Sequence, residues 1–150
     1  IIKVFFGSTF TASWYISALV IGMCFVFACD KLKIDYRIII GFTFCIYVLC
    51  CLNSNYRNLM GDDSIVVMIN RMYPGTIYNG FLAGLFWISL GYVFACKGKI
   101  HNNKRSKIGL IISFLLLLVE YFMVTKCHLT VDNDCYFMLI PGCYFIFDNF

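Results

Sequence analysis

Residues 108–125 read IGLIISFLLLLVEYFMVT, and this run decides the fold. Its only charged side chain is that of Glu120. A bilayer core about 30 Å thick is crossed by roughly 20 apolar residues in a helix, or by somewhat fewer when flanking aromatic and long side chains reach the interface. The run therefore predicts a helix that crosses a membrane.

The composition of the whole chain extends this prediction beyond one helix. The 150 residues are 61% hydrophobic and 13% charged, whereas an ordinary soluble domain is roughly 45–50% apolar and 25% charged. The charged residues gather in short windows between apolar runs. A water-soluble fold of this size could not cover such a surface, so we predict an all-α, polytopic bundle of transmembrane helices.

The same length criterion predicts about five spans in a single membrane domain. The predicted spans cover residues 9–29, 36–52, 77–96, 108–125 and 135–150. The chain starts at Ile1 rather than at Met and stops at Phe150 within an apolar run, so we expect a domain that is truncated at both ends.

The long loop after the second predicted span contains a pattern of its own. Behind the acids Asp62 and Asp63, four apolar residues recur at helical spacing: Ile65, Met68, Ile69 and Met72. Acids favour a helix N-terminus, and this spacing places the apolar residues on one face. We predict a short helix over residues 63–72 that lies on the membrane surface; the alternative is a solvated loop that packs over the bundle.

Basic residues alternate between the predicted linkers and so indicate an orientation. The linkers after the first and third spans contain Lys31, Lys33, Arg37, Lys97, Lys99, Lys104, Arg105 and Lys107. The alternate loops contain only Lys3, Arg57, Arg71 and Lys126. Because Lys and Arg accumulate in cytoplasmic loops, we predict that the N-terminus and the loop over residues 53–76 lie outside.

Glu120 is the ionisable residue that we single out, because it lies about 18 Å along its predicted helix from the basic linker. A charge at the centre of a membrane helix costs roughly 2.5–3.5 kcal/mol on insertion scales. Such residues face a polar cavity, find a partner or become neutral. Two hypotheses stay open: Glu120 lines a functional cavity, or it binds a neighbouring helix or reaches the interface beside Tyr121.

The inner linker KGKIHNNKRSK, residues 97–107, is a candidate phosphate contact. Lys104, Arg105 and Lys107 could hold the phosphates of a nucleotide-containing cofactor, although any linker that sets topology looks similar. We expect no nucleic-acid partner, because the basic patch is small and has no interleaved aromatic residues.

The cysteines and glycines have mainly structural interpretations. We expect no metal, because the chain has no C-x-x-C pair and its two histidines lie in different loops. Cys127 and Cys135 flank one outer loop and could form a disulfide there. Gly84 and Gly91 in the third span are small residues that let helix backbones approach closely.

Four stretches of the chain, taken in order, resemble the acyltransferase-3 family of membrane acyltransferases. Residues 13–20 (SWYISALV) are similar to its "LWYL-x-AL" helix opening, and Asn79 to Tyr92 to its "N-G-F/L…F-x-x-L-G-Y" helix. Residues 113–120 (SFLLLLVE) resemble its "SFLLLLxE" segment, and Tyr136 to Pro141 resembles its "Y-x-F-L-P" start of the next span. Together the four stretches extend over most of the chain.

The resemblance implies a multi-pass enzyme of the bacterial plasma membrane. Such enzymes transfer an acyl group, commonly acetyl from acetyl-CoA or another acyl-CoA, to a hydroxyl of a glycan or lipid-linked sugar. The family's catalytic histidine and arginine belong to its first helices, so we expect no catalytic residue in this sequence and no activity from it alone. The candidate cavity-lining residues are then Glu120, Trp14, Asn79 and Arg71.

Two other classes of membrane protein remain as alternatives. A polysaccharide flippase or small-solute transporter also places a buried acid and small glycines around a path. A purely structural membrane protein would use Glu120 only for stability. The lipid bilayer is a partner in all three cases.

Overall fold

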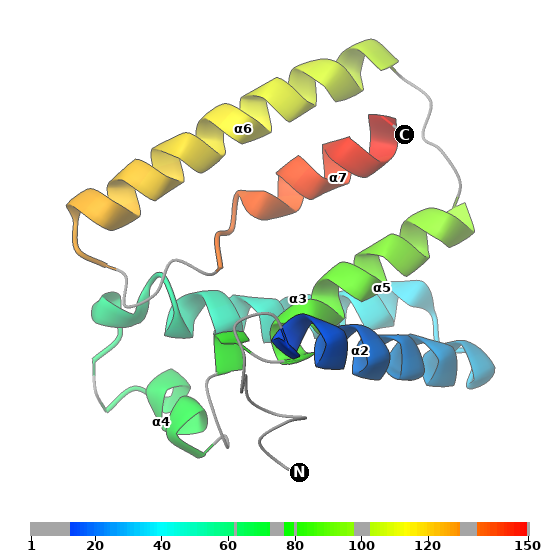
Figure 1. The fold of residues 1–150 in the computed structure, drawn as a ribbon, viewed down its shortest axis with the longest axis horizontal. Helices are drawn as coiled ribbons and strands as arrows, with labels where there is room; N and C mark the ends of the chain where they lie inside the picture. The colour runs from blue at the N-terminus through cyan, green and yellow to red at the C-terminus, as the bar shows by residue number, and fades with distance from the viewer. Residues whose placement is uncertain are drawn as a thin grey trace.

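The computed structural model describes residues 13–61, 63–72, 77–79, 81–97, 103–129 and 135–149, and within these ranges the fold is all-helical, without strands (Figure 1). This confirms the predicted all-α class. The α-helices are α2 (Ser13–Lys31), α3 (Tyr36–Asn53), α4 (Ile65–Met72), α5 (Phe81–Lys97), α6 (Asn103–Lys126) and α7 (Leu139–Asn149). Two 3₁₀ helices, η1 (Arg57–Leu59) and η2 (Ile77–Asn79), lie in the connections.

Each predicted span contains one of these helices, but the helices differ in their ability to cross a membrane. Among the described residues, two segments are long and apolar enough to do so: Tyr36–Asn53 in α3 and Arg105–Lys126 in α6. Phe81–Cys96 and Leu139–Asp148 are apolar but shorter. The coarser prediction of apolar helices holds, and the number of five spans stays a prediction.

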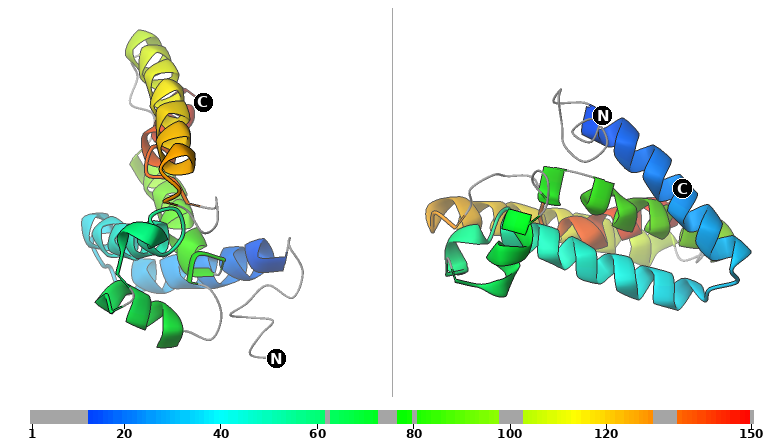
Figure 2. Two further views of the ribbon diagram at one scale, coloured as in Figure 1. Left: turned by 90° about the vertical axis from the view of Figure 1, so that its left-hand side faces the viewer. Right: turned by 90° about the horizontal axis from the view of Figure 1, so that it is seen from below.

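A tight connection joins α2 to α3. Lys33 has a positive φ of 53°, and the N–H of Ile34 donates to the carbonyl of Cys29 while that of Lys33 donates to Asp30. This pattern ends a helix by satisfying its last carbonyls. The side chain of Asp35 then accepts from the N–H of Arg37 at 3.0 Å and so caps the start of α3. The chain therefore turns back between α2 and α3, which diverge from this turn in the right view of Figure 2.

The helices are stacked in a row. In the left view of Figure 2, α6 lies at one edge, followed by α7 and α5, with α2 and α3 at the other edge. α5 packs against both α2 and α3, and α6 packs against α7. Aromatic rings connect α5 to α7. The ring centroid of Phe94 in α5 lies 5.2 Å from that of Tyr144 and 5.4 Å from that of Phe147, both in α7.

Glycines allow the closest approaches between helices. A Cβ atom added to Gly84 in α5 would lie 2.6 Å from the Cβ of Ala18 in α2, and one added to Gly109 in α6 would lie 2.5 Å from the ring of Phe145. Around Gly91 nothing lies within 4 Å. Gly84 therefore has the packing role that the sequence predicts, whereas Gly91 does not have it within the described part of the chain.

The buried core lies where α3, α5 and η2 meet the segment that leads into α7. Its members are mostly apolar or sulfur-containing: Tyr47, Cys50, Cys51, Ile77, Tyr78, Ala83, Phe86, Leu90 and Cys135. The rings of Tyr47, Phe86 and Trp87 contact one another, with all three centroid distances 5.1 Å. This core holds together three segments that are far apart in the sequence.

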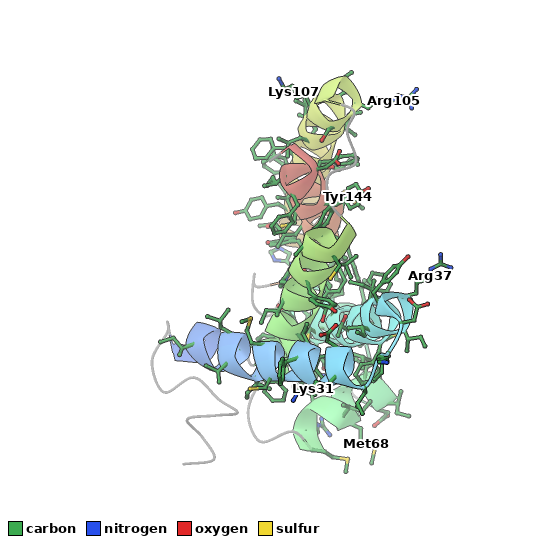
Figure 3. All side chains as sticks on the ribbon, turned by 90° about the vertical axis from the view of Figure 1, so that its right-hand side faces the viewer. Lys31, Arg37, Met68, Arg105, Lys107 and Tyr144 are labelled. Atoms are coloured by element: carbon green, nitrogen blue, oxygen red, sulfur yellow. The ribbon has the colours of Figure 1, made fainter. Side chains whose placement is uncertain are left out.

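The ends of the helices alternate between the two ends of the molecule. In Figure 1, the α2–α3 turn, the end of α5 and the start of α6 lie on the right, whereas the ends of α3 and α6 lie on the left and α5 begins between them. Figure 3 looks at the right-hand end and shows Lys31, Arg37, Arg105 and Lys107 there. These four of the basic side chains that the sequence assigns to the cytoplasmic face thus lie at one end of the bundle.

Large apolar side chains cover the outer surface of α6. The exposed ones are Ile108, Ile111, Ile112, Phe114, Leu115, Leu116, Leu118, Val119, Tyr121, Phe122 and Met123. α2 and α3 also expose apolar side chains, among them Met23, Phe27 and Phe42. Monomeric soluble proteins rarely expose a contiguous apolar patch larger than a few hundred Å². The exposed surface of these helices is therefore suited to an apolar environment.

α4 presents a second apolar surface. Val67 is fully buried on the side that packs against α3. The opposite face exposes the side chains that the sequence places on one stripe: Ile65, Met68, Ile69 and Met72. The short helix predicted over residues 63–72 is present, and its apolar stripe faces away from the bundle.

Candidate functional site

Glu120 is buried in α6, on the side turned toward α7 and away from the exposed apolar surface. Its Oε1 atom accepts the hydroxyl of Tyr56 at 2.5 Å and the backbone N–H of Phe137 at 2.9 Å. Its Oε2 atom accepts the N–H of Met138 at 2.8 Å. The carboxylate therefore connects α6 to the segment after α3 and to the segment before α7.

The two backbone donors explain why an acid is suited to this place. Phe137 and Met138 immediately precede Leu139, where α7 begins. Backbone N–H groups in a buried turn need acceptors, and a carboxylate is a strong one. Glu120 thus fixes, from another helix, the turn that leads into α7.

These contacts bear on the two hypotheses for Glu120. The structure supplies partners for the one in which Glu120 binds a neighbouring helix. All three bonds are made to the carboxylate, so it is already engaged as an acceptor at both oxygens. A role for Glu120 in lining a cavity stays a prediction.

Tyr56 is the side-chain partner of Glu120. Its ring also packs on that of Phe137, with the centroids 5.3 Å apart. Burial, followed by the hydrogen bond to Glu120 and its charge, raises the pKa of the Tyr56 phenol above its ordinary value. The phenol therefore stays protonated at neutral pH and remains a donor to the carboxylate.

Three consecutive polar residues, the last one of α3 and the two that follow it, are also buried. Asn53, Ser54 and Asn55 are at most 2% exposed. The Nδ2 atom of Asn53 donates to the Leu49 carbonyl at 3.0 Å, and the Ser54 hydroxyl donates to Oδ1 of Asn55 at 3.0 Å. Asn53 Oδ1 and Asn55 Nδ2 have no hydrogen-bond partner. Because buried polar atoms are normally paired, these two amides are suited to bind water or a hydroxyl group.

We call the side chains of Asn53, Asn55, Tyr56 and Glu120 the outer polar cluster, because the predicted orientation puts this end of the bundle outside. Chemically, the cluster offers a carboxylate, a protonated phenol and two amide atoms. The sequence singled out Glu120 but missed the other three residues. The feature that could have identified Asn53 and Asn55 is the run of polar residues from Asn53 to Asn55, which stands at the end of an apolar helix in a chain with few polar side chains.

The remaining candidate residues lie elsewhere. Arg71 is exposed in the last turn of α4. Arg105 and Lys107 are exposed in the first turns of α6 (Figure 3), toward the opposite end of that helix from Glu120. The side chains of Trp14, Asn79 and Lys104 lie outside the described part of the chain.

The cysteine and metal predictions can also be compared with the structure. Cys127 is exposed and Cys135 is buried, and both are free thiols, so the pair is not bridged here. In the ranges that the structure describes, no group of three His, Cys, Asp or Glu side chains could hold a metal ion.

Comparison with known proteins finds no family model, no curated protein and no solved structure that matches this chain. Function is therefore inferred from the residues, their contacts and the four sequence motifs.

Proposed function

We propose that this chain is part of a multi-pass protein of the bacterial plasma membrane. The exposed apolar surface of α6 supports this proposal, since it runs from Ile108 to Met123 and would be unfavourable in water. The alternating ends of the bundle support it as well. Basic side chains gather at one end of the bundle, in agreement with the excess of Lys and Arg in the cytoplasmic loops of membrane proteins.

We further propose that the bundle belongs to a membrane-bound O-acyltransferase that uses an acyl-CoA, commonly acetyl-CoA, to modify a glycan or lipid-linked sugar. One observation carries this step: the four motif segments meet in pairs. Ala18 of the first segment packs against Gly84 of the second. Glu120 of the third segment binds the N–H groups of Phe137 and Met138 in the fourth. The stretches that make the resemblance thus pack against each other in pairs.

The two ends of the bundle suit the two substrates of such a reaction. Arg105 and Lys107 are exposed cations at the end predicted to be cytoplasmic, where an acyl-CoA is available, and cations of this kind bind phosphate groups. The outer polar cluster lies at the other end, where a cell-surface glycan would be. Of its polar atoms, Asn53 Oδ1 and Asn55 Nδ2 have no hydrogen-bond partner, and an amide oxygen and an amide nitrogen are suitable partners for a sugar hydroxyl.

Acyl transfer to a hydroxyl also needs a general base, and the thioester oxygen needs hydrogen-bond donors in a site sheltered from water. The resemblance assigns the base to a histidine on helices that this sequence does not include. Within the proposal, the described helices position the acceptor and close the bundle around it.

The proposal is tested with the protein made from its complete reading frame. Purified protein in lipid vesicles is given radiolabelled acetyl-CoA and cell-envelope glycan, and we expect label in the glycan. Asn55→Ala should lower the transfer rate per folded molecule, with gel filtration as the measure of folded protein, if the outer polar cluster binds the acceptor. Absence of transfer with several acceptors would reject the enzyme. Movement of unmodified glycan or solute across the vesicle would instead indicate a carrier.

A further inference from the structure

Three buried cysteines lie next to the outer polar cluster. Cys50 and Cys51 belong to the last turn of α3, and Cys135 precedes α7. All three are at most 4% exposed, and they share the buried core with Tyr47. Segments that are far apart in the sequence thus bring their thiols into one dry cluster.

The thiols in this cluster have different neighbours. The Cys50 thiol donates to the carbonyl of Ile77 at 3.6 Å and so points toward η2. Cys51 is fully buried in the same cluster as Cys135 and Tyr47. Because the Cys50 thiol is directed to η2, Cys51 is the α3 cysteine that is left to pair with Cys135.

Contacts that do not involve sulfur hold these two residues in place. The Tyr47 hydroxyl donates to the carbonyl of Tyr136 at 2.9 Å, directly beside Cys135. Glu120 binds the N–H groups of Phe137 and Met138. The segment that carries Cys135 is thus fixed against α3 and α6 before any covalent bond is formed.

We propose that Cys51 and Cys135 form a disulfide that joins the end of α3 to the segment leading into α7. Both residues lie at the end of the bundle that the charge pattern puts outside, and disulfides form and persist in oxidising extracytoplasmic compartments. The structure describes the reduced pair. This pairing replaces the one between Cys127 and Cys135 that the loop spacing indicated, because Cys127 is exposed and Cys135 is covered.

The reaction is a thiol–disulfide exchange with an oxidant that itself carries a disulfide. The Cys51 thiolate attacks one sulfur of the oxidant, forms a mixed disulfide and releases the second oxidant sulfur as a thiolate. The Cys135 thiolate then attacks Cys51, which forms the new S–S bond and releases the first oxidant sulfur. The oxidant gains two electrons, and the two protons of the cysteines end on its sulfurs.

Burial sets when this exchange takes place and how the product behaves. The folded core covers both thiols, so we expect oxidation while the chain is still assembling. The same cover then shields the bond from reductants. The disulfide should therefore resist dithiothreitol in the folded protein and yield to it after denaturation.

The test is differential thiol labelling of the full chain isolated from cell membranes. Free thiols are blocked in denaturant with one maleimide, disulfides are then reduced, and the released thiols are labelled with an isotopically heavy maleimide before mass spectrometry. We expect heavy label on Cys51 and Cys135 together, and light label on Cys50 and Cys127. Heavy label on Cys127 with Cys135, or light label on both members of the proposed pair, would overturn the proposal.

Matched variants make the result specific. Cys51→Ser should leave Cys135 with light label, whereas Cys50→Ser, one residue away, should leave the pair intact. The pair is also reduced in denaturant, and the protein is returned to detergent in the presence of diamide, with gel filtration as a check that each variant is folded. Wild-type protein that refolds without closing the bond between Cys51 and Cys135 would contradict the assigned geometry. The outcome does not depend on whether the protein transfers acyl groups.

Discussion

Glu120 is a single side chain that joins three segments, and its replacement should measure the strength of that junction. Glu120→Gln keeps the shape of the side chain but removes its charge. The amide NH₂ group, which donates, then replaces one carboxylate oxygen, which accepted from an N–H or a phenol. Hydrogen bonds to a charged group contribute about 1.5–3 kcal/mol, so we expect the free energy of unfolding to fall by about 2 kcal/mol. Thermal unfolding in detergent, followed by tryptophan fluorescence, measures this change.

The matched control for this prediction is Tyr121→Phe. Tyr121 follows Glu120 in α6 but is exposed, and surface substitutions of this kind usually stay within about 0.5 kcal/mol. A Glu120→Gln protein that unfolds at the wild-type midpoint would show that the three hydrogen bonds do not stabilise the fold.

Tyr56 adds a dependence on alkaline pH. Its folded-state pKa lies above the ordinary phenol value of 10.0, so the folded protein holds this proton more tightly than the unfolded chain does. The stability that results is present in full below pH 10.0 and declines as the pH rises past that value. The stability difference between the wild type and Tyr56→Phe should therefore be constant at neutral pH and shrink in alkaline buffer. Urea unfolding of both proteins over this range checks it.

The sequence identified Glu120 as a buried acid but could not identify its partners. Tyr56 is 64 residues away in the chain, and its position in an outer loop fits an aromatic at the membrane interface equally well. The other two donors are backbone N–H groups, which leave no trace in side-chain identity. Only the three-dimensional structure shows that the start of α7 lies beside this carboxylate.

At the scale of elements, the α2–α5 contact depends on the absence of a side chain at Gly84. Gly84→Ala would put a methyl group 2.6 Å from the Cβ of Ala18, an atom fixed to its own helix backbone, so the helices must move apart. Overpacking of this kind costs about 1–3 kcal/mol. We expect a lower unfolding midpoint in detergent for Gly84→Ala than for wild-type protein.

Two further variants test the geometric reason. Gly91→Ala lies in the same helix with open space around it, so it should unfold at the wild-type midpoint or slightly above, because Ala favours a helix over Gly. Ala18→Gly combined with Gly84→Ala removes the collision and should recover much of the loss. Equal midpoints for the two single alanine variants would contradict the packing role of Gly84.

The bounds of the helices show which parts of the structure depend only on nearby sequence. Apolar run length predicted a helix in every span, and helical spacing predicted α4. The starts of α5 and α7 were predicted four residues early, at 77 and 135, whereas the helices begin at Phe81 and Leu139. Before α7 the chain is held by Tyr47 and Glu120 in a non-helical path, and such a tertiary constraint is not visible in a hydrophobic run.

At the scale of the whole molecule, the position of the basic side chains predicts which end is accessible from outside the cell. An impermeant maleimide applied to intact cells should label native Cys127, which is exposed at the end of α6. In a Cys127→Ser background, Lys107→Cys should be labelled only after the membrane is permeabilised. Labelling of Lys107→Cys in intact cells would invert the orientation.

Composition and the spacing of apolar runs were enough to predict the class of fold and the alternation of the helices. They could not predict the order in which the helices stack. The buried polar residues of α6, Ser106, Ser113 and Glu120, recur every seven residues and mark its packed face, but this spacing does not identify the helix that packs there. Small residues such as Gly84 allow two helices to approach closely. Which helix packs against such a residue is known only from the structure.

The contact between Glu120 and the residues that precede α7 has a consequence for biosynthesis. A ribosome makes α6 before residues 137 and 138, so Glu120 is synthesised while its amide partners do not yet exist. In the proposed orientation its side chain must also travel to the far side of the bilayer, where an unpaired charge is unfavourable. Stable insertion of α6 would then depend on the synthesis and docking of the last helix.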